Sequence, residues 1–219
     1  MTAGEHIEII GAGGHAKAAI GAAQMAGFVV DRAYDDDPAK WGTTVLGVPV
    51  EGPIDSVREG GGKRVVIAVG DAALRAVLAL RFDLPCATIV HPRAYVHSSA
   101  SLGPGTIVFA GAVIQPDVRI GAHAIINANA TVSYDCIVAD FAHLSPGVDL
   151  AGEVHIGTGA FLGTGAVVLR GVAVGDWTTV GAGSAVIGDL PNHVLAAGSP
   201  ARIVRYLAPN LSPPSALIA

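Results

Sequence analysis

Branched aliphatic residues recur at every sixth position between residues 96 and 186, without one interruption. A fixed short period is typical of a solenoid, and six is the period of a parallel β-helix, in which each segment forms one short strand and a turn. An amphipathic α-helix does not keep this register, because six residues advance by about 240° at 3.6 residues per turn. The pattern predicts a three-sided prism with an aliphatic interior. The periodic positions are Val96, Leu102, Val108, Ile114, Ile120, Ile126, Val132, Val138, Leu144, Leu150, Ile156, Leu162, Val168, Val174, Val180 and Val186, and Val90 extends the series by one step.

The residues beside these aliphatics fit the same geometry. A small or β-branched residue stands two positions earlier, as at Ala100, Thr106 and Cys136, where a corner leaves little room. Glycine often follows the aliphatic, as at Gly103 and Gly157, and glycine tolerates the backbone conformations of a turn. Three such segments close one coil, so residues eighteen apart are predicted to stack.

The first 85 residues follow a different pattern. A short strand over 7–10 leads into a glycine-rich turn, a helix over 16–26 and a second strand over 28–33. A strand with a bend at 45–50, a strand at 64–69, a helix at 72–81 and a strand at 87–90 follow, with a flexible connection at 60–62. This order predicts an α/β domain with a mainly parallel sheet over residues 1–85, and the β-helix over 86–207. The register fails at Asn192. We expect Pro191 and Pro200 to break the strand pattern, and the proline-rich tail at 208–219 is typical of disorder.

The first turn favours an anion site. Gly11, Gly13 and Ala16 match only the permissive form of the dinucleotide fingerprint, and 85 residues are too few for a two-halved dinucleotide fold. Glycines still let a phosphate approach the backbone, and the free N–H groups of the following helix attract it. Asp35 and Asp36 at the end of the second strand suit sugar hydroxyls. We therefore favour nucleotide or nucleotide-sugar binding over a purely structural turn.

Composition narrows the classes of protein. The hydrophobic content is 51% with a mean hydropathy of +0.54, yet no apolar run reaches the roughly 18 residues of a membrane helix. No secretory signal pattern is present, and two cysteines are too few for a disulfide framework. A net charge of −5 argues against nucleic acid as a partner. A cytoplasmic protein without membrane insertion is expected.

Because aliphatic side chains fill the predicted prism, a catalytic or binding site must lie on its exterior or between neighbouring prisms. The polar residues that gather on the exterior are Asn127, Asn129, Ser133, Tyr134, Asp135, Asp140 and His143. His143 is a candidate base or hydrogen-bond donor, and the alternative is a solvated surface residue. His91, His97, His123, His155 and His193 are interpreted as surface residues. None has the spacing of a zinc site, so no metal is expected.

Several motifs together resemble one family. They are Ile10-Gly11-Ala12-Gly13-Gly14-His15, Asp35-Asp36, Ala68-Val69-Gly70-Asp71, the hexapeptide array, Asp135-Cys136-Ile137, His143-Leu144-Ser145-Pro146-Gly147, Leu150-Ala151-Gly152 and Gly198-Ser199-Pro200-Ala201. Nearly the whole chain is similar to the nucleotide-sugar N-acetyltransferases that acylate amino-dideoxysugars such as bacillosamine and perosamine, and to related sialic acid O-acetyltransferases.

The resemblance implies a left-handed β-helix that forms homotrimers, with acetyl-CoA in the groove between adjacent prisms. It implies an N-terminal domain that holds the nucleotide-linked amino-sugar through Gly13, Gly14 and His15, with Asp35, Asp36 and Gly70 nearby. It further implies that Gly152 N–H stabilises the oxyanion, that His143 approaches the thioester or acetyl group, and that Thr164 and Ala182 line the CoA groove. The implied pathway is polysaccharide biosynthesis.

One position departs from the family pattern. The general base of the family is a histidine directly before an acidic residue, and here Tyr134 precedes Asp135. A phenol with a pKa near 10 is a poor base at neutral pH. Three outcomes stay open: His143 replaces the base with support from Asp135, Tyr134 only positions the substrate while water takes the proton, or the protein binds without transfer. The prediction is an acetyl-CoA-dependent N-acetyltransferase, with an O-acetyltransferase or a non-catalytic homologue as alternatives.

Overall fold

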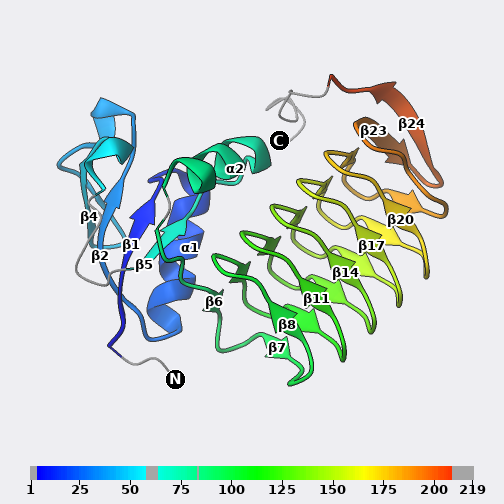
Figure 1. Ribbon diagram of the computed structural model, residues 1–219, viewed down its shortest axis with the longest axis horizontal. Helices are drawn as coiled ribbons and strands as arrows, with labels where there is room; N and C mark the ends of the chain where they lie inside the picture. The colour runs from blue at the N-terminus through cyan, green and yellow to red at the C-terminus, as the bar shows by residue number, and fades with distance from the viewer. Residues whose placement is uncertain (1–3, 58–63, 83, 209–219) are drawn as a thin grey trace.

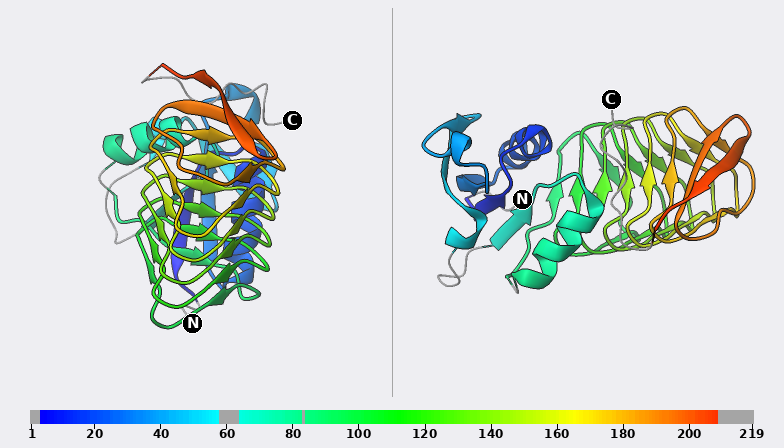
Figure 2. Two further views of the ribbon diagram at one scale, coloured as in Figure 1. Left: turned by 90° about the vertical axis from the view of Figure 1, so that its right-hand side faces the viewer. Right: turned by 90° about the horizontal axis from the view of Figure 1, so that it is seen from above.

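A computed structural model describes residues 4–57, 64–82 and 84–208 of the chain. An α/β unit lies at one end, and the coils of a parallel β-helix stack away from it (Figures 1 and 2). The predicted order of an α/β domain followed by a solenoid is thus confirmed. The connection at 60–62 and all but one residue of the proline-rich tail fall outside the described residues.

The α/β unit contains a five-stranded sheet of order β3-β4-β2-β1-β5. Its neighbours pair in parallel, except for the hairpin of β3 and β4, so the predicted mainly parallel sheet is confirmed. Helix α1 joins β1 to β2, and α2 follows β5. The bounds are β1 (His6–Ile10), α1 (Gly14–Met25), β2 (Val29–Tyr34), η1 (Pro38–Lys40), β3 (Thr44–Val45), β4 (Val48–Gly52), η2 (Ile54–Ser56), β5 (Arg64–Ile67) and α2 (Ala72–Arg81).

The solenoid has three faces, each named here by one strand. The β13 face comprises β7 (Tyr95–Val96), β10 (Val113–Ile114), β13 (Thr131–Val132), β16 (Asp149–Leu150), β19 (Val167–Val168) and β22 (Ala185–Val186). The β14 face comprises β8 (Ser101–Leu102), β11 (Arg119–Ile120), β14 (Ile137–Val138), β17 (His155–Ile156) and β20 (Ala173–Val174). The β15 face comprises β6 (Ile89–Val90), β9 (Ile107–Val108), β12 (Ile125–Ile126), β15 (His143–Leu144), β18 (Phe161–Leu162), β21 (Thr179–Val180), β23 (Val194–Gly198) and β24 (Ala201–Tyr206).

The periodic aliphatics form the interior, as predicted. Leu144, Leu150 and Ile156, one on each face of a coil, are all at most 1% exposed. From Thr106 to Ser184, the residues two positions earlier are also buried at the corners, and polar ones bridge consecutive coils. Thr106 Oγ1 donates to Gly121 O at 2.7 Å and accepts from Ala124 N at 3.2 Å. Residues eighteen apart therefore stack, as the sequence predicts.

Glycine in one corner column makes room for a polar cap from the next coil. Asp140 Oδ1 accepts from Ala122 N, and Asp176 Oδ1 accepts from Thr158 N, each at 2.7 Å. A Cβ on Gly121 or Gly157 would lie within 2.6 Å of these carboxylates or of the backbone beside them. The column thus needs glycine wherever an aspartate of the following coil caps the corner.

Gly157→Ala is expected to destabilise the solenoid. The added Cβ would lie 2.6 Å from both the backbone nitrogen and the carboxylate of Asp176, and backbone cannot move aside as a side-chain tip can. Overpacking of this kind costs about 2–3 kcal/mol, which corresponds to a melting temperature lower by roughly 5–10 °C. Calorimetry measures the shift. Gly188→Ala is the control, because no heavy atom lies within 4 Å of its Cβ position, and equal melting temperatures for both variants would contradict the packing argument.

The end of the solenoid differs from the prediction. Pro191 and Pro200 do not end the strand pattern, because β23 lies between them and β24 follows Pro200. The last step along the β15 face takes sixteen residues in place of eighteen, as the bond from Val194 N to Thr178 Oγ1 shows. The chain then reverses, and β24 pairs antiparallel with β23. The hexapeptide register is thus lost while strand pairing continues.

The α/β unit packs against the first strands of the β15 face. Ile107 and Ile125 point outward from this face, yet they are at most 1% exposed because they join one apolar cluster with Ala16 and Ala19 of α1. Phe109 belongs to the same cluster. This contact places the N-terminal end of α1 next to His143, one coil further along.

Candidate functional site

A pocket of about 470 Å³ opens at the glycine-rich turn. Its lining comes from the turn, from the first residues of α1 and from the β3–β4 hairpin. Helix α1 begins at Gly14 without a side-chain cap, so no N-cap side chain occupies its first N–H groups, and Lys17 adds a positive charge. Uncapped N–H groups and a cation attract phosphate. The lining residues are Ala12, Gly13, Gly14, Lys17, Thr44, Val45 and Leu46.

Asp35 and Asp36 hold the loops around this pocket. Asp35 Oδ2 accepts from Ala12 N and from Lys40 Nζ, each at 2.8 Å, so it ties the glycine turn to η1. Burial raises the pKa of Asp35, but the hydrogen bonds from Lys40 and the backbone outweigh it and hold the pKa below its ordinary value. Asp36 Oδ1 accepts from Ile54 N at 2.9 Å at the start of η2. Both carboxylates thus have structural partners beside the predicted sugar site.

His15, Gly70 and His143 meet where the α/β unit touches the β15 face. The rings of His15 and His143 are 5.9 Å apart, and His143 packs edge-on against Phe161 at 5.2 Å. The Nδ1 atom of His143 lies 3.4 Å from Gly70 O. Among the described residues, no hydrogen-bond partner meets the buried Nε2 atom of His15.

The partners of His143 fix its tautomer. A carbonyl oxygen only accepts, so Nδ1 carries the proton toward Gly70. Asn127 Oδ1 accepts from Ala128 N at 2.8 Å, which turns Asn127 Nδ2 toward His143 Nε2 at 3.4 Å. The Nε2 atom is therefore the acceptor. Both ring nitrogens are engaged within the protein.

Electrostatics keeps both histidines neutral. Burial, the neighbouring His15 and the cation of Arg75 lower the pKa of His143 to about 3, against a smaller opposite effect of Gly70 O. Burial and Arg75 lower the pKa of His15 to about 4. A group with so low a pKa holds a proton weakly at neutral pH, which makes His143 a poor general base.

Tyr134, Asp135 and Gly152 lie at the corner between the β13 and β14 faces, named here the Tyr134 corner (residues 133–136 and 151–154). Tyr134 is 40% exposed, and its ring covers Gly152, where an added Cβ would meet the ring at 2.5 Å. Asp135 is exposed and has a φ of 57°. The phenol is thus held directly over the backbone of the next coil.

Thr164 and Ala182 occupy a third place. They stack at the corner between the β15 and β13 faces, where Gly183 N donates to Thr164 O at 2.8 Å. Both residues are exposed. A ligand lying along this corner would contact them without disturbing the interior.

The structure groups the predicted residues into separate sets. Gly13, Gly14, His15, Gly70 and His143 belong to one continuous region, because His15 follows the pocket residues and contacts His143. The Tyr134 corner lies opposite the β15 face of the same prism. Within one chain, Asp135 therefore lies on the far side of the prism from His143 and does not orient it.

Sequence reasoning missed two buried residues near His143. The sequence pattern places Arg75 in an ordinary helix, but its side chain is 1% exposed and lies on the same buried side of α2 as Ala72 and Leu78. His123, predicted to be a surface residue, is 9% exposed, so that prediction is wrong. Its ring stacks on Phe141 with centroids 5.3 Å apart, and Arg75 bonds to its carbonyl. The spacing of α2 was the available signal for Arg75.

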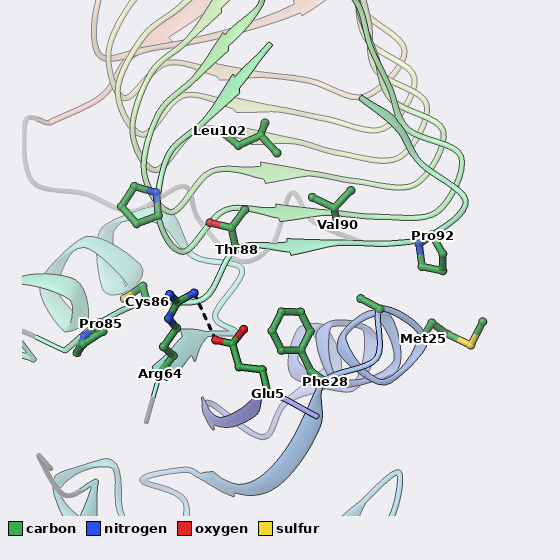
Figure 3. A pocket seen from close by; sticks show the side chains of 12 residues that line it. Glu5, Met25, Phe28, Arg64, Pro85, Cys86, Thr88, Val90, Pro92 and Leu102 are labelled. Atoms are coloured by element: carbon green, nitrogen blue, oxygen red, sulfur yellow. Dashed lines mark ion pairs between the residues drawn. The ribbon is translucent and has the colours of Figure 1, made fainter. Parts of the chain in front are cut away.

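A larger pocket of about 850 Å³ lies apart from these residues (Figure 3). It opens between the α/β unit and the first coil, and its lining includes Met25 and Phe28 from the α/β unit and Thr88 and Val90 from the coil. Glu5 and Arg64 form an ion pair of 3.3 Å across its floor. None of the predicted site residues lines it, so it is not the expected substrate site.

Two further features bear on the class of protein. Within residues 4–57, 64–82 and 84–208, no group of three His, Cys, Asp or Glu side chains is placed to hold a metal ion. No helix in this part of the chain is long and apolar enough to cross a membrane.

Two family models match the chain. Residues 6–82 match the PglD N-terminal domain, and residues 99–134 match the bacterial transferase hexapeptide model of six repeats. These are the two parts that the structure joins through α1 and the β15 face. Comparison with curated protein sequences gives no match.

Solved structures resemble the whole fold. A histidine-to-alanine mutant of GDP-perosamine N-acetyl transferase from Caulobacter crescentus, in complex with CoA and GDP-perosamine, is 43% identical; the match covers 90% of this chain and 96% of that chain with a TM-score of 0.86. The acetyltransferase domain of PglB from Neisseria gonorrhoeae FA1090, in complex with acetyl coenzyme A, is 32% identical over 92% and 100%, with a TM-score of 0.84. WeeI from Acinetobacter baumannii AYE, at 24% identity over 92% and 100% and a TM-score of 0.80, shares the fold.

Proposed function

The chain belongs to the nucleotide-sugar N-acetyltransferase family and is an acetyltransferase that uses acetyl-CoA, and we propose that it acetylates the amino group of a nucleotide-linked amino-dideoxysugar. The observation that carries the proposal is the continuity between the anion pocket of α1 and the buried His15–His143 pair. A GDP-linked 4-amino sugar of the perosamine type is the first candidate, since a relative of 43% identity binds GDP-perosamine. Such a product would serve surface polysaccharide synthesis.

The acceptor binds at the α/β unit in this proposal. Its phosphates lie at Gly13, Gly14 and Lys17, where α1 begins without a side-chain cap beside the pocket. Asp35 and Asp36 keep the surrounding loops in place and lie near the nucleoside. The sugar then extends past His15, whose Nε2 has no hydrogen-bond partner among the described residues, toward Gly70 and His143.

The transfer site is completed by a second copy. The acceptor region belongs to the β15 face, whereas Tyr134, Asp135 and Gly152 lie at the opposite corner of the prism. In a closed homotrimer, each interface takes its two surfaces from different copies. We assign the Tyr134 corner of one copy to the acceptor region of its neighbour. Acetyl-CoA lies in the groove between them, along the exposed corner of Thr164 and Ala182.

An apolar strip beside the Tyr134 corner supports assembly. Val167, Leu169 and Ile187 are 44%, 54% and 51% exposed, although the residues around them are polar or small. Exposed apolar patches of this kind mark surfaces that contact other proteins. Burial of this strip against a second copy would bring the adjacent Tyr134 corner into the interface.

The proposed chemistry is direct transfer. The neutral amine attacks the thioester carbonyl carbon, the carbonyl electron pair moves to oxygen, and Gly152 N–H stabilises the resulting oxyanion. The carbon–sulfur bond then breaks, the amine proton is released, and the products are the amide and the free thiol of CoA. Because His143 is neutral with both nitrogens engaged, it positions the acetyl group rather than accepting a proton.

Tyr134 positions the acceptor in this mechanism. Its ring is held over Gly152, so the phenol lies beside the proposed oxyanion donor. The amine proton passes to water at the exposed corner, where Asp135 lies.

Turnover of the parent protein tests the proposal. Incubation with acetyl-CoA and a GDP-linked 4-amino-4,6-dideoxysugar is expected to release free CoA thiol and an acetylated nucleotide-sugar, both measured by mass spectrometry. The matched control acceptor carries a hydroxyl group in place of the amine, and we expect no product from it. Acetylation of the hydroxyl acceptor alone would favour the O-acetyltransferase. No product with any 4-amino acceptor, despite saturable binding, would establish the non-catalytic alternative.

A further inference from the structure

The guanidinium of Arg75 is buried where α2 meets the solenoid. Its side chain is 1% exposed and is among the largest fully buried side chains of the described residues. Removing a charge from water is costly unless its donors are satisfied, so the contacts of a buried arginine reveal what it holds. Burial lowers the pKa of Arg75 to about 10, while the nearby Asp71 acts in the opposite direction. The side chain is thus a cation at neutral pH.

Arg75 donates to four backbone carbonyls on two sides. On the α/β side, Nη1 donates to Val69 O at 2.7 Å and to Gly70 O at 3.0 Å. On the solenoid side, Nε donates to His123 O at 2.8 Å and Nη2 to Phe141 O at 2.6 Å. His123 and Phe141 stack at consecutive corners with φ of 53° and 60°. One fork therefore joins the turn after β5 to two coils.

These carbonyls set the surroundings of His143. Gly70 O receives both Arg75 Nη1 and His143 Nδ1, so Arg75 fixes the acceptor that determines the tautomer of His143. Phe141, held by Nη2, lies two residues before His143 on the same coil. Gly70 also lies against His15, since a Cβ on Gly70 would be 3.8 Å from the His15 side chain.

The two parts of the protein also share a contact that does not involve Arg75. An apolar cluster already joins α1 to the β15 face through Ile107, Phe109 and Ile125. The contribution of Arg75 is local and directional, because a planar fork reaches carbonyls on both sides whereas an ammonium group cannot. The apolar cluster thus contributes to the stability of the contact, whereas Arg75 sets the position of the groups that it bonds.

We propose that Arg75 is a positioning residue of the transfer site, which fixes the Gly70 turn, and through it the rings of His143 and His15, against the solenoid. The inference rests on the proposed function for its kinetic consequence. Its structural consequence, the fixed tautomer of His143, does not depend on activity.

Arg75→Met tests the proposal, because methionine fills similar space without donors. We expect kcat to fall at least tenfold, with the KM for acetyl-CoA changed less than threefold. Long-range ¹H–¹⁵N spectra of the imidazoles should show the Nδ1–H form of His143 replaced by a mixture of tautomers. Arg75→Lys, which keeps the charge, should fold as the parent does and have a kcat between those of the parent and Arg75→Met. Arg81→Met on the exposed side of α2 is the control, with parental kinetics and spectra.

Parental His143 signals and kcat in Arg75→Met would overturn the proposal. The proposal would also be overturned if kcat falls only in proportion to the amount of folded protein. If Arg75→Met does not fold, the kcat and spectra of Arg75→Lys test the proposal in its place. If the parent itself shows no turnover, the proposed function fails, but the imidazole spectra still test the role of Arg75 independently.

Discussion

Tyr134→His raises kcat/KM at neutral pH by about 10- to 100-fold, because a positioned general base contributes typically 10²–10⁴-fold and a phenol supplies little of it. In the parent, the Tyr134 ring lies over Gly152. The proposed mechanism passes the amine proton to water and not to a side chain at this corner. Histidine, with an ordinary pKa near 6.5, can accept the amine proton there. Steady-state kinetics with the same acceptor at saturating acetyl-CoA measures the gain.

The pH profiles of the two proteins should differ. In the parent, the rate rises with pH as the acceptor ammonium loses its proton to water, without a plateau set by the protein. In Tyr134→His, the rate levels off above about pH 6.5, where the imidazole is neutral. His143→Ala is expected to lower kcat without changing either profile, because both nitrogens of His143 are engaged and its pKa is about 3.

Tyr134→Phe is the matched control for the phenol. If Tyr134 only positions the acceptor, this variant retains activity within about tenfold of the parent, a loss comparable to one hydrogen bond. Abolished activity in Tyr134→Phe, together with no gain in Tyr134→His, would instead assign proton transfer to the phenol itself. A change of pH profile in His143→Ala would restore His143 as the base.

The solenoid was predictable because its signal is repeated in every coil. Buried aliphatics such as Leu144 and Leu150 carry the period, and the period then predicts contacts between residues eighteen apart. The contact of Tyr134 with Gly152 follows directly from this rule. The end of the array was less predictable, because the sixteen-residue step to β23 departs from the period of eighteen and does not recur.

The acceptor region was predictable only in part. The glycine turn and His15 have local signatures, but the burial of His143 depends on the Gly70 turn, which is 73 residues away. Arg75 bonds to the carbonyls of His123 and Phe141, 48 and 66 residues away. Any residue type supplies a carbonyl, so these partners leave no mark in the sequence.

The proposed site between copies predicts complementation between two inactive variants. Gly13→Val places a side chain in the anion pocket, where no heavy atom lies within 4 Å of the Cβ position, so the fold is kept while phosphate is excluded. Gly152→Val pushes the Tyr134 ring outward and blocks the proposed oxyanion donor. Each variant alone is expected to lose more than about 100-fold in kcat/KM, since removal of one oxyanion donor alone costs about 10²–10³-fold. A cooperative thermal transition and a parental circular dichroism spectrum at the assay temperature check that each variant is folded.

Co-expression of the two variants under different affinity tags, followed by purification on both, isolates the mixed assemblies. In a cyclic trimer of either composition, one interface joins an intact pocket to an intact Tyr134 corner, so activity should return to about one third of the parental value. Mixed assemblies as inactive as the separate variants would contradict the account, because the pocket and the Tyr134 corner would then have to act within one chain.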